Sequence, residues 1–195
     1  MTYVIEVIYD NPGGKSPGRR SAQLQELKTA GKLSHQEHFT LSEEIRDTNY
    51  RAVSLLKFEN VSEATGFADG HVPERSARVI CELEISIGNF ERTDRNDVFL
   101  VNPFEISQAQ VPEVLDMWHK AKGHMIENEG FVNARLFRSS RLKDRYGLVN
   151  ISQWTSAEKF KQALGDKAYD KHRERSLNYK LHPSLCVRQH MLETA

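Results

Sequence analysis

One predicted strand in the second half of the chain, VNISQW at residues 149–154, holds the residue types best suited to chemistry. Alternation along a strand places Asn150, Ser152 and Trp154 on one face. Asn150 is then an amide in the middle of a half-buried strand, where it needs a hydrogen-bond partner. The strand pattern alone favours a core in which neighbouring groups satisfy the amide and Trp154 simply packs. The alternative interpretation is an amide and an indole that point into a ligand pocket between the sheet and its helices.

A second mid-strand amide, Asn102, lies in the segment FLVNPFEI at residues 99–106. Pro103 follows it and cannot donate to a strand ladder, which indicates an edge strand or a bulge. Two amides on two strands of one sheet could converge on one carbonyl or oxyanion of a ligand. We expect Asn133 and Arg135, on the next strand, to share that face.

The eight histidines form no recognisable metal or nucleophile motif. His119 and His124 are five residues apart, so they do not stack on one helix face as ligands four apart would. His172 lies in the charged stretch DKAYDKHRER at residues 166–175, which is typical of a solvated helix face. The two cysteines are too few for a cysteine-built zinc site. The residue pattern therefore predicts no metal centre.

The balance of acidic and basic residues indicates which kinds of molecule the protein is expected to bind. The chain has 27 basic and 27 acidic residues and a formal net charge of zero, which argues against a nucleic-acid binder and gives no reason to expect a membrane partner. The apolar runs fall far short of the roughly 20 residues that span a bilayer. The first residues lack the features of a signal peptide. We expect a cytoplasmic protein with a small-molecule partner.

The order of predicted elements repeats along the chain. Strands are expected at 3–9, 34–42, 50–58 and 77–87, with helices at 19–30 and 62–67, the second capped by Ser62. The same order then starts again, with strands at 98–106, 131–138, 146–154 and 185–192, a helix at 111–125 and helical turns from Ser156 to about residue 179. Each half reads β-α-β-β-α-β.

This repeat, at a spacing of about 95 residues, predicts an α+β fold built from two ferredoxin-like halves. We place the halves at residues 1–90 and 98–195, with a polar linker at 88–97. A four-stranded sheet that carries helices on one face must bury its other face. The simplest way is against the second half, so we expect two sheets packed face to face within one chain.

From about residue 98 to 192 the chain resembles the antibiotic-biosynthesis monooxygenase family, which has the dimeric α+β-barrel fold. The likeness rests on Asn102 in the first strand, on ENEGF at residues 127–131 before the second strand, and on VNISQW followed by TSAEKF at 155–160. The first half resembles a degenerate copy, with Phe58 where Trp154 stands. The family resemblance implies an intrachain dimeric α+β barrel.

The resemblance also implies an activity. Members that form quinones in aromatic polyketide pathways use no cofactor and oxidise a small aromatic substrate with dioxygen. By this likeness Asn150 and Trp154 are the expected catalytic residues, with Asn102 assisting. Phe160 stands where that branch carries a tyrosine, which leaves the proton transfer without its hydroxyl. The expected substrate-binding residues are Trp118, Asn133, Arg135 and Phe160.

Two alternatives stay open at this point. The haem-degrading branch of the same family has an asparagine that Asn102 matches and an axial histidine near the position of His172, but its helix tryptophan corresponds to about Ala163. In that case the cofactor is haem. The third interpretation is a ligand-binding barrel without catalysis, since a fold alone does not fix a function. Whether two chains associate into a homodimer is also left open.

Overall fold

Eight strands and five α-helices make up the described part of the chain. The computed structural model describes residues 2–9, 17–70, 75–92 and 94–189. The first half comprises β1 (Thr2–Ile8), α1 (Pro17–Thr29), β2 (Leu33–Glu44), β3 (Ala52–Phe58), α2 (Val61–Asp69) and β4 (Ser76–Gly88). The second half comprises β5 (Val98–Phe104), α3 (Val111–Ile126), β6 (Phe131–Ser139), β7 (Leu148–Trp154), α4 (Ala157–Gly165), the 3₁₀ turn η1 (Lys167–Tyr169), α5 (Asp170–Ser176) and β8 (Ser184–Gln189).

The strands close into one barrel in the order β1-β3-β2-β8-β5-β7-β6-β4, and every pairing is antiparallel. Each half contributes four consecutive strands of this barrel. The halves meet edge to edge where β2 pairs with β8 and where β4 pairs with β6. Closure leaves no unpaired strand edge. The predicted α+β fold, an intrachain dimeric α+β barrel of two ferredoxin-like halves, is confirmed.

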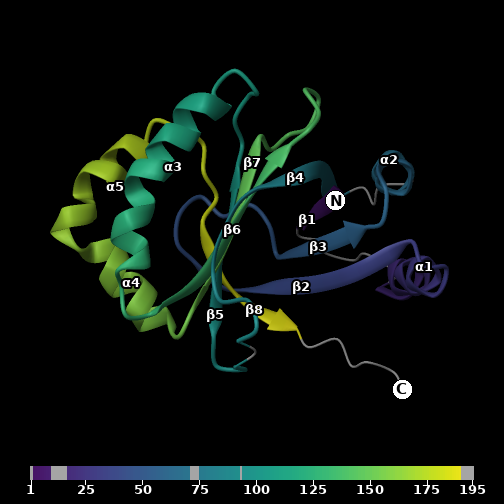
Figure 1. Ribbon diagram of the computed structural model, residues 1–195, viewed down its shortest axis with the longest axis horizontal. Coiled ribbons are helices and arrows are strands. Elements are labelled where there is room, and N and C mark those ends of the chain that lie inside the picture. The colour runs from purple at the N-terminus through teal and green to yellow at the C-terminus, as the bar shows by residue number, and fades with distance from the viewer. Residues whose placement is uncertain (1, 10–16, 71–74, 93, 190–195) are drawn as a thin grey trace.

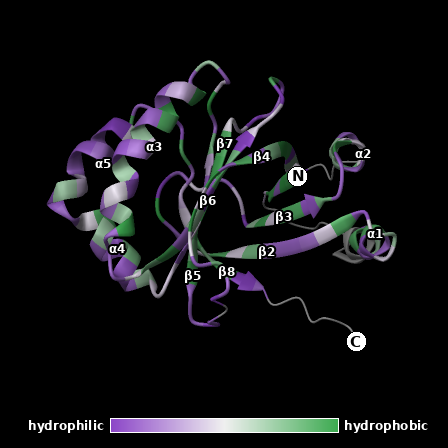
Figure 2. Ribbon diagram, in the orientation of Figure 1, coloured by the Kyte–Doolittle hydropathy of each residue, from purple (hydrophilic) through white to green (hydrophobic). Residues whose placement is uncertain are grey.

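The helices cover two opposite sides of the barrel (Figure 1). Helices α3, α4 and α5 lie over the sheet of the second half, and α1 and α2 lie over the sheet of the first. Hydrophobic residues gather in the central strands, whereas α5 at the outer edge is largely hydrophilic (Figure 2). None of the helices in the described residues is long and apolar enough to cross a membrane.

The barrel interior is a core to which both halves contribute. The rings of Phe39 and Phe99, one from each half, have their centroids 5.1 Å apart. The buried hydroxyl of Tyr50 donates a hydrogen bond of 2.7 Å to the backbone oxygen of Val101 across the same boundary. Because this hydroxyl has a hydrogen-bond partner, Tyr50 can be buried without leaving a polar group unpaired. The two sheets therefore bury their inner faces against each other, as expected.

Two local predictions concern helix starts. Helix α2 begins at Val61 and is capped by Asn60, whose side chain accepts a hydrogen bond from the backbone N–H of Glu63, so the predicted cap at Ser62 is wrong. Asparagine is as good a cap as serine, and the pattern could not rank two adjacent candidates. Ser156 caps α4 as predicted. Residues 190–192 of the last predicted strand lie outside the described residues.

The connection between the halves begins at Gly88, where the backbone conformation and a close neighbour leave no room for a side chain. Gly88 ends β4 with φ of 91°, and a Cβ atom there would lie 2.3 Å from the backbone oxygen of Val132. Only glycine fits both the left-handed backbone and this close approach. β5 then begins at Val98. We propose residues 1–90 and 98–195 as the two domains, joined by the linker at 88–97.

A buried carboxylate ties the halves together inside the barrel. Glu37 Oε2 on β2 lies 2.7 Å from Arg135 Nη1 on β6, and Glu37 Oε1 lies 3.1 Å from Arg188 Nη1 on β8. Burial acts to raise the pKa of Glu37, but His35 and Arg135 outweigh it and lower the pKa from 4.5 to about 2. The carboxylate is therefore charged in the folded protein at all but very low pH.

This shift makes stability depend on acid. Since the folded pKa of Glu37 is depressed, its contribution is present above pH 4.5 and is lost as the pH falls toward 2, by on the order of 3 kcal/mol. We expect Glu37→Gln to lower the urea-unfolding free energy at pH 7, because two arginines lose their counter-ion. The same variant should lose less stability than the wild type between pH 5 and pH 3. Glu129→Gln, at an exposed surface pair, is the matched control and should change neither value.

Candidate functional site

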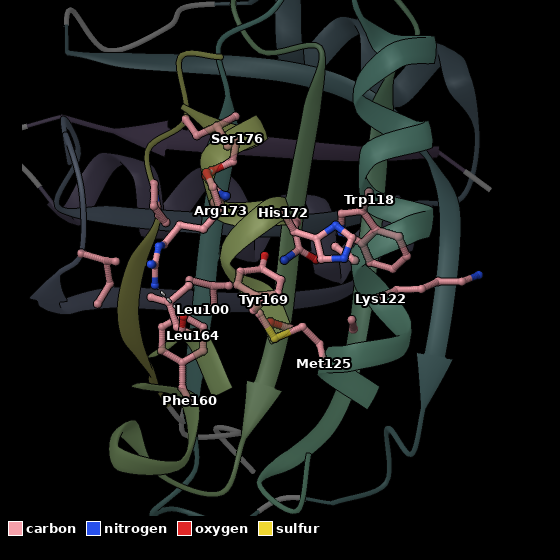
Figure 3. A pocket seen from close by; sticks show the side chains of 18 of the residues that line it. Leu100, Trp118, Lys122, Met125, Phe160, Leu164, Tyr169, His172, Arg173 and Ser176 are labelled. Atoms are coloured by element: carbon pink, nitrogen blue, oxygen red, sulfur yellow. Dashed lines mark hydrogen bonds between the residues drawn. The ribbon is translucent and has the colours of Figure 1, made fainter. Parts of the chain in front are cut away.

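A cavity of about 340 Å³ lies between the outer face of the second half's sheet and helices α3, α4 and α5 (Figure 3). Its volume falls within the range of roughly 300–1,000 Å³ typical of small-molecule sites. Most of its lining is apolar. Its floor is formed by alternate residues of two neighbouring strands, namely Leu100, Asn102 and Phe104 of β5 and Asn150, Ser152 and Trp154 of β7.

The alternation predicted for β7 is what builds this floor. Val149 and Ile151 belong to the barrel core, while Asn150 and Trp154 line the cavity on the other face. Asn102 and Asn150 are direct partners in the β5–β7 ladder, so their side chains lie next to each other. The structure thus brings together the three residues that the sequence singled out as catalytic. Their roles stay predictions.

The two amides differ in how they are satisfied. Asn102 Oδ1 accepts a hydrogen bond of 3.1 Å from the backbone N–H of His182, which Pro103 O also accepts. Asn150 is 7% exposed, and its Oδ1 has no hydrogen-bond partner in the structure. A buried acceptor left unpaired costs about 1–3 kcal/mol. An amide that lines a cavity and carries this cost is suited to bind a polar group of a ligand.

Trp154 forms an apolar wall beside the amides. Its ring packs edge-on against Phe160 and Phe131, with centroids 5.3 and 5.6 Å away. Its indole Nε1–H donates to Ser152 Oγ at 3.1 Å, so this N–H is not aimed at a ligand. Ser152 accepts that bond and keeps its own proton for a ligand oxygen. The sequence placed Ser152 on the correct face but did not single it out.

The helices supply the opposite wall. Figure 3 shows Trp118 and Met125 of α3, Tyr169 of η1 and His172 of α5 grouped around the cavity. The rings of Tyr169 and His172 lie 5.7 Å apart. The charge pattern of residues 166–175 predicts a solvated helix face, and this is wrong for His172, which is half-buried. Its neighbours are largely exposed, but the stretch folds over the cavity and turns this one imidazole inward.

Two predicted binding residues do not reach the cavity. Asn133 donates through Nδ2 to Gln153 Oε1 at 2.6 Å, and Arg135 pairs with Glu37 inside the barrel. The expectation that they share the face of Asn150 is wrong. Alternation along β6 places Ala134, not its two neighbours, on the helix-facing side. Trp118 and Phe160, the other two predicted binding residues, do line the cavity.

The first half also contributes to this pocket, which the sequence did not predict. Ile45 and Arg46, from the connection between β2 and β3, and Ile87 of β4 lie in the lining. Burial raises the pKa of Tyr169, and the charges of Arg173 and Arg46, which line the same cavity, oppose that rise. No periodicity along the chain could have assigned Arg46 to a site some 100 residues away.

The corresponding place in the first half is filled. Glu6 pairs with Ser54 in the β1–β3 ladder, as Asn102 pairs with Asn150 in the β5–β7 ladder. Arg78 donates through Nε to Glu6 Oε1 at 2.9 Å, and its guanidinium lies 3.9 Å from the centre of the Phe67 ring. Both charged side chains are almost fully buried. An ion pair and a phenylalanine therefore occupy the space that is open in the second half.

The metal-binding potential of the chain is low within the described residues. There, no three His, Cys, Asp or Glu side chains are placed together to hold a metal ion. His172 is the imidazole in the cavity, and it could serve as a single axial ligand to a haem iron.

Solved structures with the same fold are found over nearly the whole chain. An anthrone oxidase-like protein matches with a TM-score of 0.66 and 11% identity, over 97% of this chain and 91% of that one. A ferredoxin-fold protein of Listeria monocytogenes related to antibiotic biosynthesis monooxygenases matches with a TM-score of 0.51 and 14% identity, over 98% and 96%. A heme-degrading enzyme from the same species matches with a TM-score of 0.50 and 13% identity, over 96% and 99%.

These similarities establish the architecture. The chain has the dimeric α+β-barrel fold of proteins related to antibiotic biosynthesis monooxygenases, as the sequence resemblance implied. No protein-family model and no curated protein sequence matches it. At identities this low the likeness carries the fold alone, so the function has to come from the site.

The two floor amides give a direct test of the site. Asn150→Leu removes an unpaired buried acceptor, so we expect its unfolding free energy to stay equal or to rise. Asn102→Leu is the matched variant on the partner strand, and it should lose on the order of 1 kcal/mol because the His182 N–H loses one acceptor. Chemical denaturation of both variants measures this. Loss of stability in Asn150→Leu comparable to that in Asn102→Leu would show that Asn150 is a structural residue.

Proposed function

We propose that this protein is a cofactor-independent monooxygenase that oxidises a small aromatic, polyketide-like substrate with dioxygen in the second-half cavity. The observation that carries the proposal is the unpartnered Asn150 Oδ1 on the floor of a mainly apolar cavity. An aromatic ring system would lie between the Trp154 wall and the Trp118 wall, where a ring hydroxyl would donate a hydrogen bond to Asn150 Oδ1 while Asn150 Nδ2 donates to a ring oxygen. The fold shared with an anthrone oxidase-like protein suggests an anthrone as the test substrate.

The proposed reaction needs few protein groups. Loss of a proton from the ring carbon of an anthrone gives an enolate, whose oxygen is held by Asn150 Nδ2 and the Ser152 hydroxyl. The enolate carbon donates its electrons to dioxygen, so that a C–O bond forms, and the proton taken up earlier is returned to give a hydroperoxide. The second hydrogen of that carbon then leaves as a proton, its electron pair forms the carbonyl, the O–O bond breaks, and the hydroxide that departs takes up this proton as water. Anthrone and O₂ thus yield anthraquinone and H₂O, with the substrate oxidised and dioxygen reduced. His172 is the lining group suited to accept the ring proton, a role that Phe160 cannot fill.

Oxygen consumption tests this proposal. We expect the wild type to accelerate oxygen uptake with an anthrone, and Asn150→Ala to lower kcat by about 100-fold, the usual loss for one oxyanion donor. Trp154→Ala should raise KM because the substrate ring loses its packing surface on one side of the cavity. Asn178→Ala, an exposed asparagine outside the lining, is the control and should behave as the wild type. Uptake that is absent, or unchanged in both cavity variants, contradicts the oxygenase and favours a non-catalytic ligand-binding barrel.

Haem binding is the second candidate, and the position of His172 in the cavity is the observation that favours it. His172 would hold the haem iron, and Arg46 and Arg173 are the cationic residues that would pair with its carboxylates. Bound haem would supply an iron centre for dioxygen activation. The cavity volume lies at the low end for small-molecule sites, which fits a few fused rings better than a porphyrin.

A hemin titration separates the two candidates. If haem is the ligand, hemin gives a Soret band that His172→Ala abolishes, whereas His119→Ala, at an exposed position on α3, leaves the band unchanged. We expect instead no saturable Soret band with the wild type. A one-to-one complex that depends on His172 would replace the cofactor-independent proposal with a haem enzyme.

A further inference from the structure

The charged side chains in the lining of the cavity all carry the same sign. Arg46, Lys122 and Arg173 are in the lining, and among the described lining residues there is no aspartate or glutamate. The floor of the cavity is uncharged, with two amides and a serine. The cavity therefore combines a hydrogen-bonding floor, apolar walls and a cationic rim.

Arg46, Lys122 and Arg173 differ in whether a carboxylate of the protein lies close to them. Arg173 donates through Nη2 to Asp170 Oδ1 at 2.7 Å. Lys122 extends away from Tyr169 and His172 in Figure 3. Arg46 is only 25% exposed, and its Nε lies 4.0 Å from a carboxylate oxygen of Asp47, a side chain that is 77% exposed. Arg46 is thus a half-buried cation whose ion pair with Asp47 is long.

The other contacts of Arg46 are long. Its Nη1 and Nη2 donate to the hydroxyl and the backbone oxygen of Ser176, each at 3.4 Å. Good bonds from a guanidinium to an oxygen measure about 2.7–2.9 Å when the acceptor is charged. A half-buried cation with one long ion pair and two long neutral contacts is only partly compensated. An anionic group on the ligand would supply the missing partner.

Arg46 is held in place at the rim by the second half. The backbone N–H groups of Ile45 and Arg46 both donate to Pro183 O at 3.3 Å. The hydroxyls of Thr48 and Ser184 lie 2.6 Å apart. These bonds fix the β2–β3 connection to the chain that leads into β8, and Arg46 reaches from there to Ser176 at the end of α5. The guanidinium is therefore positioned before a ligand arrives.

We propose that the substrate is an aromatic carboxylate whose carboxylate group is bound by Arg46, a residue that the first half contributes to the second-half cavity. The inference rests on the proposed function, since it assigns a substrate class to the same site. It also assigns a role to the first half, which completes the binding site. A carboxylate on a small fused-ring acid and a propionate on haem share this chemistry, and cavity volume favours the small acid.

A pair of ring probes that differ only in charge tests the proposal. Anthracene-2-carboxylate and its neutral isostere anthracene-2-carboxamide have the same ring system. The sequence has two tryptophans, Trp118 and Trp154, and both line the cavity. Quenching of their fluorescence therefore reports binding, without any need for turnover. At low salt we expect the wild type to bind the carboxylate at least about tenfold more tightly than the carboxamide, as a charge-assisted hydrogen bond predicts.

The variants identify the residue responsible. Arg46→Gln should reduce the preference to less than about threefold and leave the carboxamide affinity unchanged, which also shows that the cavity is intact. Arg46→Lys should keep part of the preference, because it retains the charge without the planar fork. Arg51→Gln is the matched control from the same connection. Its side chain is more than half exposed and lies outside the lining, so it should keep the full preference.

Each other outcome overturns the proposal. Equal wild-type affinity for the two probes, no quenching by either probe, or a preference that survives Arg46→Gln all reject it. Dependence on Arg46 that is seen with hemin alone rejects the small acid in favour of a porphyrin. Uptake of oxygen that depends on Asn150, together with no carboxylate preference, rejects this inference and keeps the oxygenase. A carboxylate preference without oxygen uptake keeps the binding site and rejects the oxygenase.

Discussion

Each half of this chain forms a four-stranded sheet with helices on one face, and the other face must be removed from water. The two sheets do this by burying their inner faces against each other and pairing at both edges. Contacts such as Phe39 with Phe99, and Glu37 with Arg135, join residues of different halves. The cavity accordingly lies on an outer face, between the sheet of the second half and its helices.

The two outer faces are built on the same arrangement of strands but carry different side chains. Their equivalence is visible in the ladders, where Glu6 and Asn102 occupy the same register position. In the first half the buried Glu6–Arg78 pair and Phe67 fill the face, and the attraction and hydrogen bond between the two charges offset part of the cost of removing them from water. In the second half the same position carries an amide beside a cavity. One half therefore contributes stability and the rim residue Arg46, and the other contributes the floor and walls.

The fold alone does not choose among the activities found on it. An anthrone oxidase-like protein and a heme-degrading enzyme share this architecture with the chain. What distinguishes them has to be the chemistry of individual side chains in one pocket. Here the features that matter are an unpaired amide oxygen, an indole whose N–H is already bonded to Ser152, one inward imidazole and a guanidinium with only a long ion pair.

The sequence by itself determined the repeat of β-α-β-β-α-β, the face of β7 that carries Asn150 and Trp154, and the cap at Ser156. These features depend on periods of two or 3.6 residues and on cap chemistry, which are local properties of the chain. The tertiary structure decided that Arg46 joins the site, that His172 turns inward, and that Asn133 and Arg135 face the barrel core. Those outcomes depend on how the sheets close and how α5 lies over the cavity. Contacts between residues far apart in the chain leave no periodic signal in it.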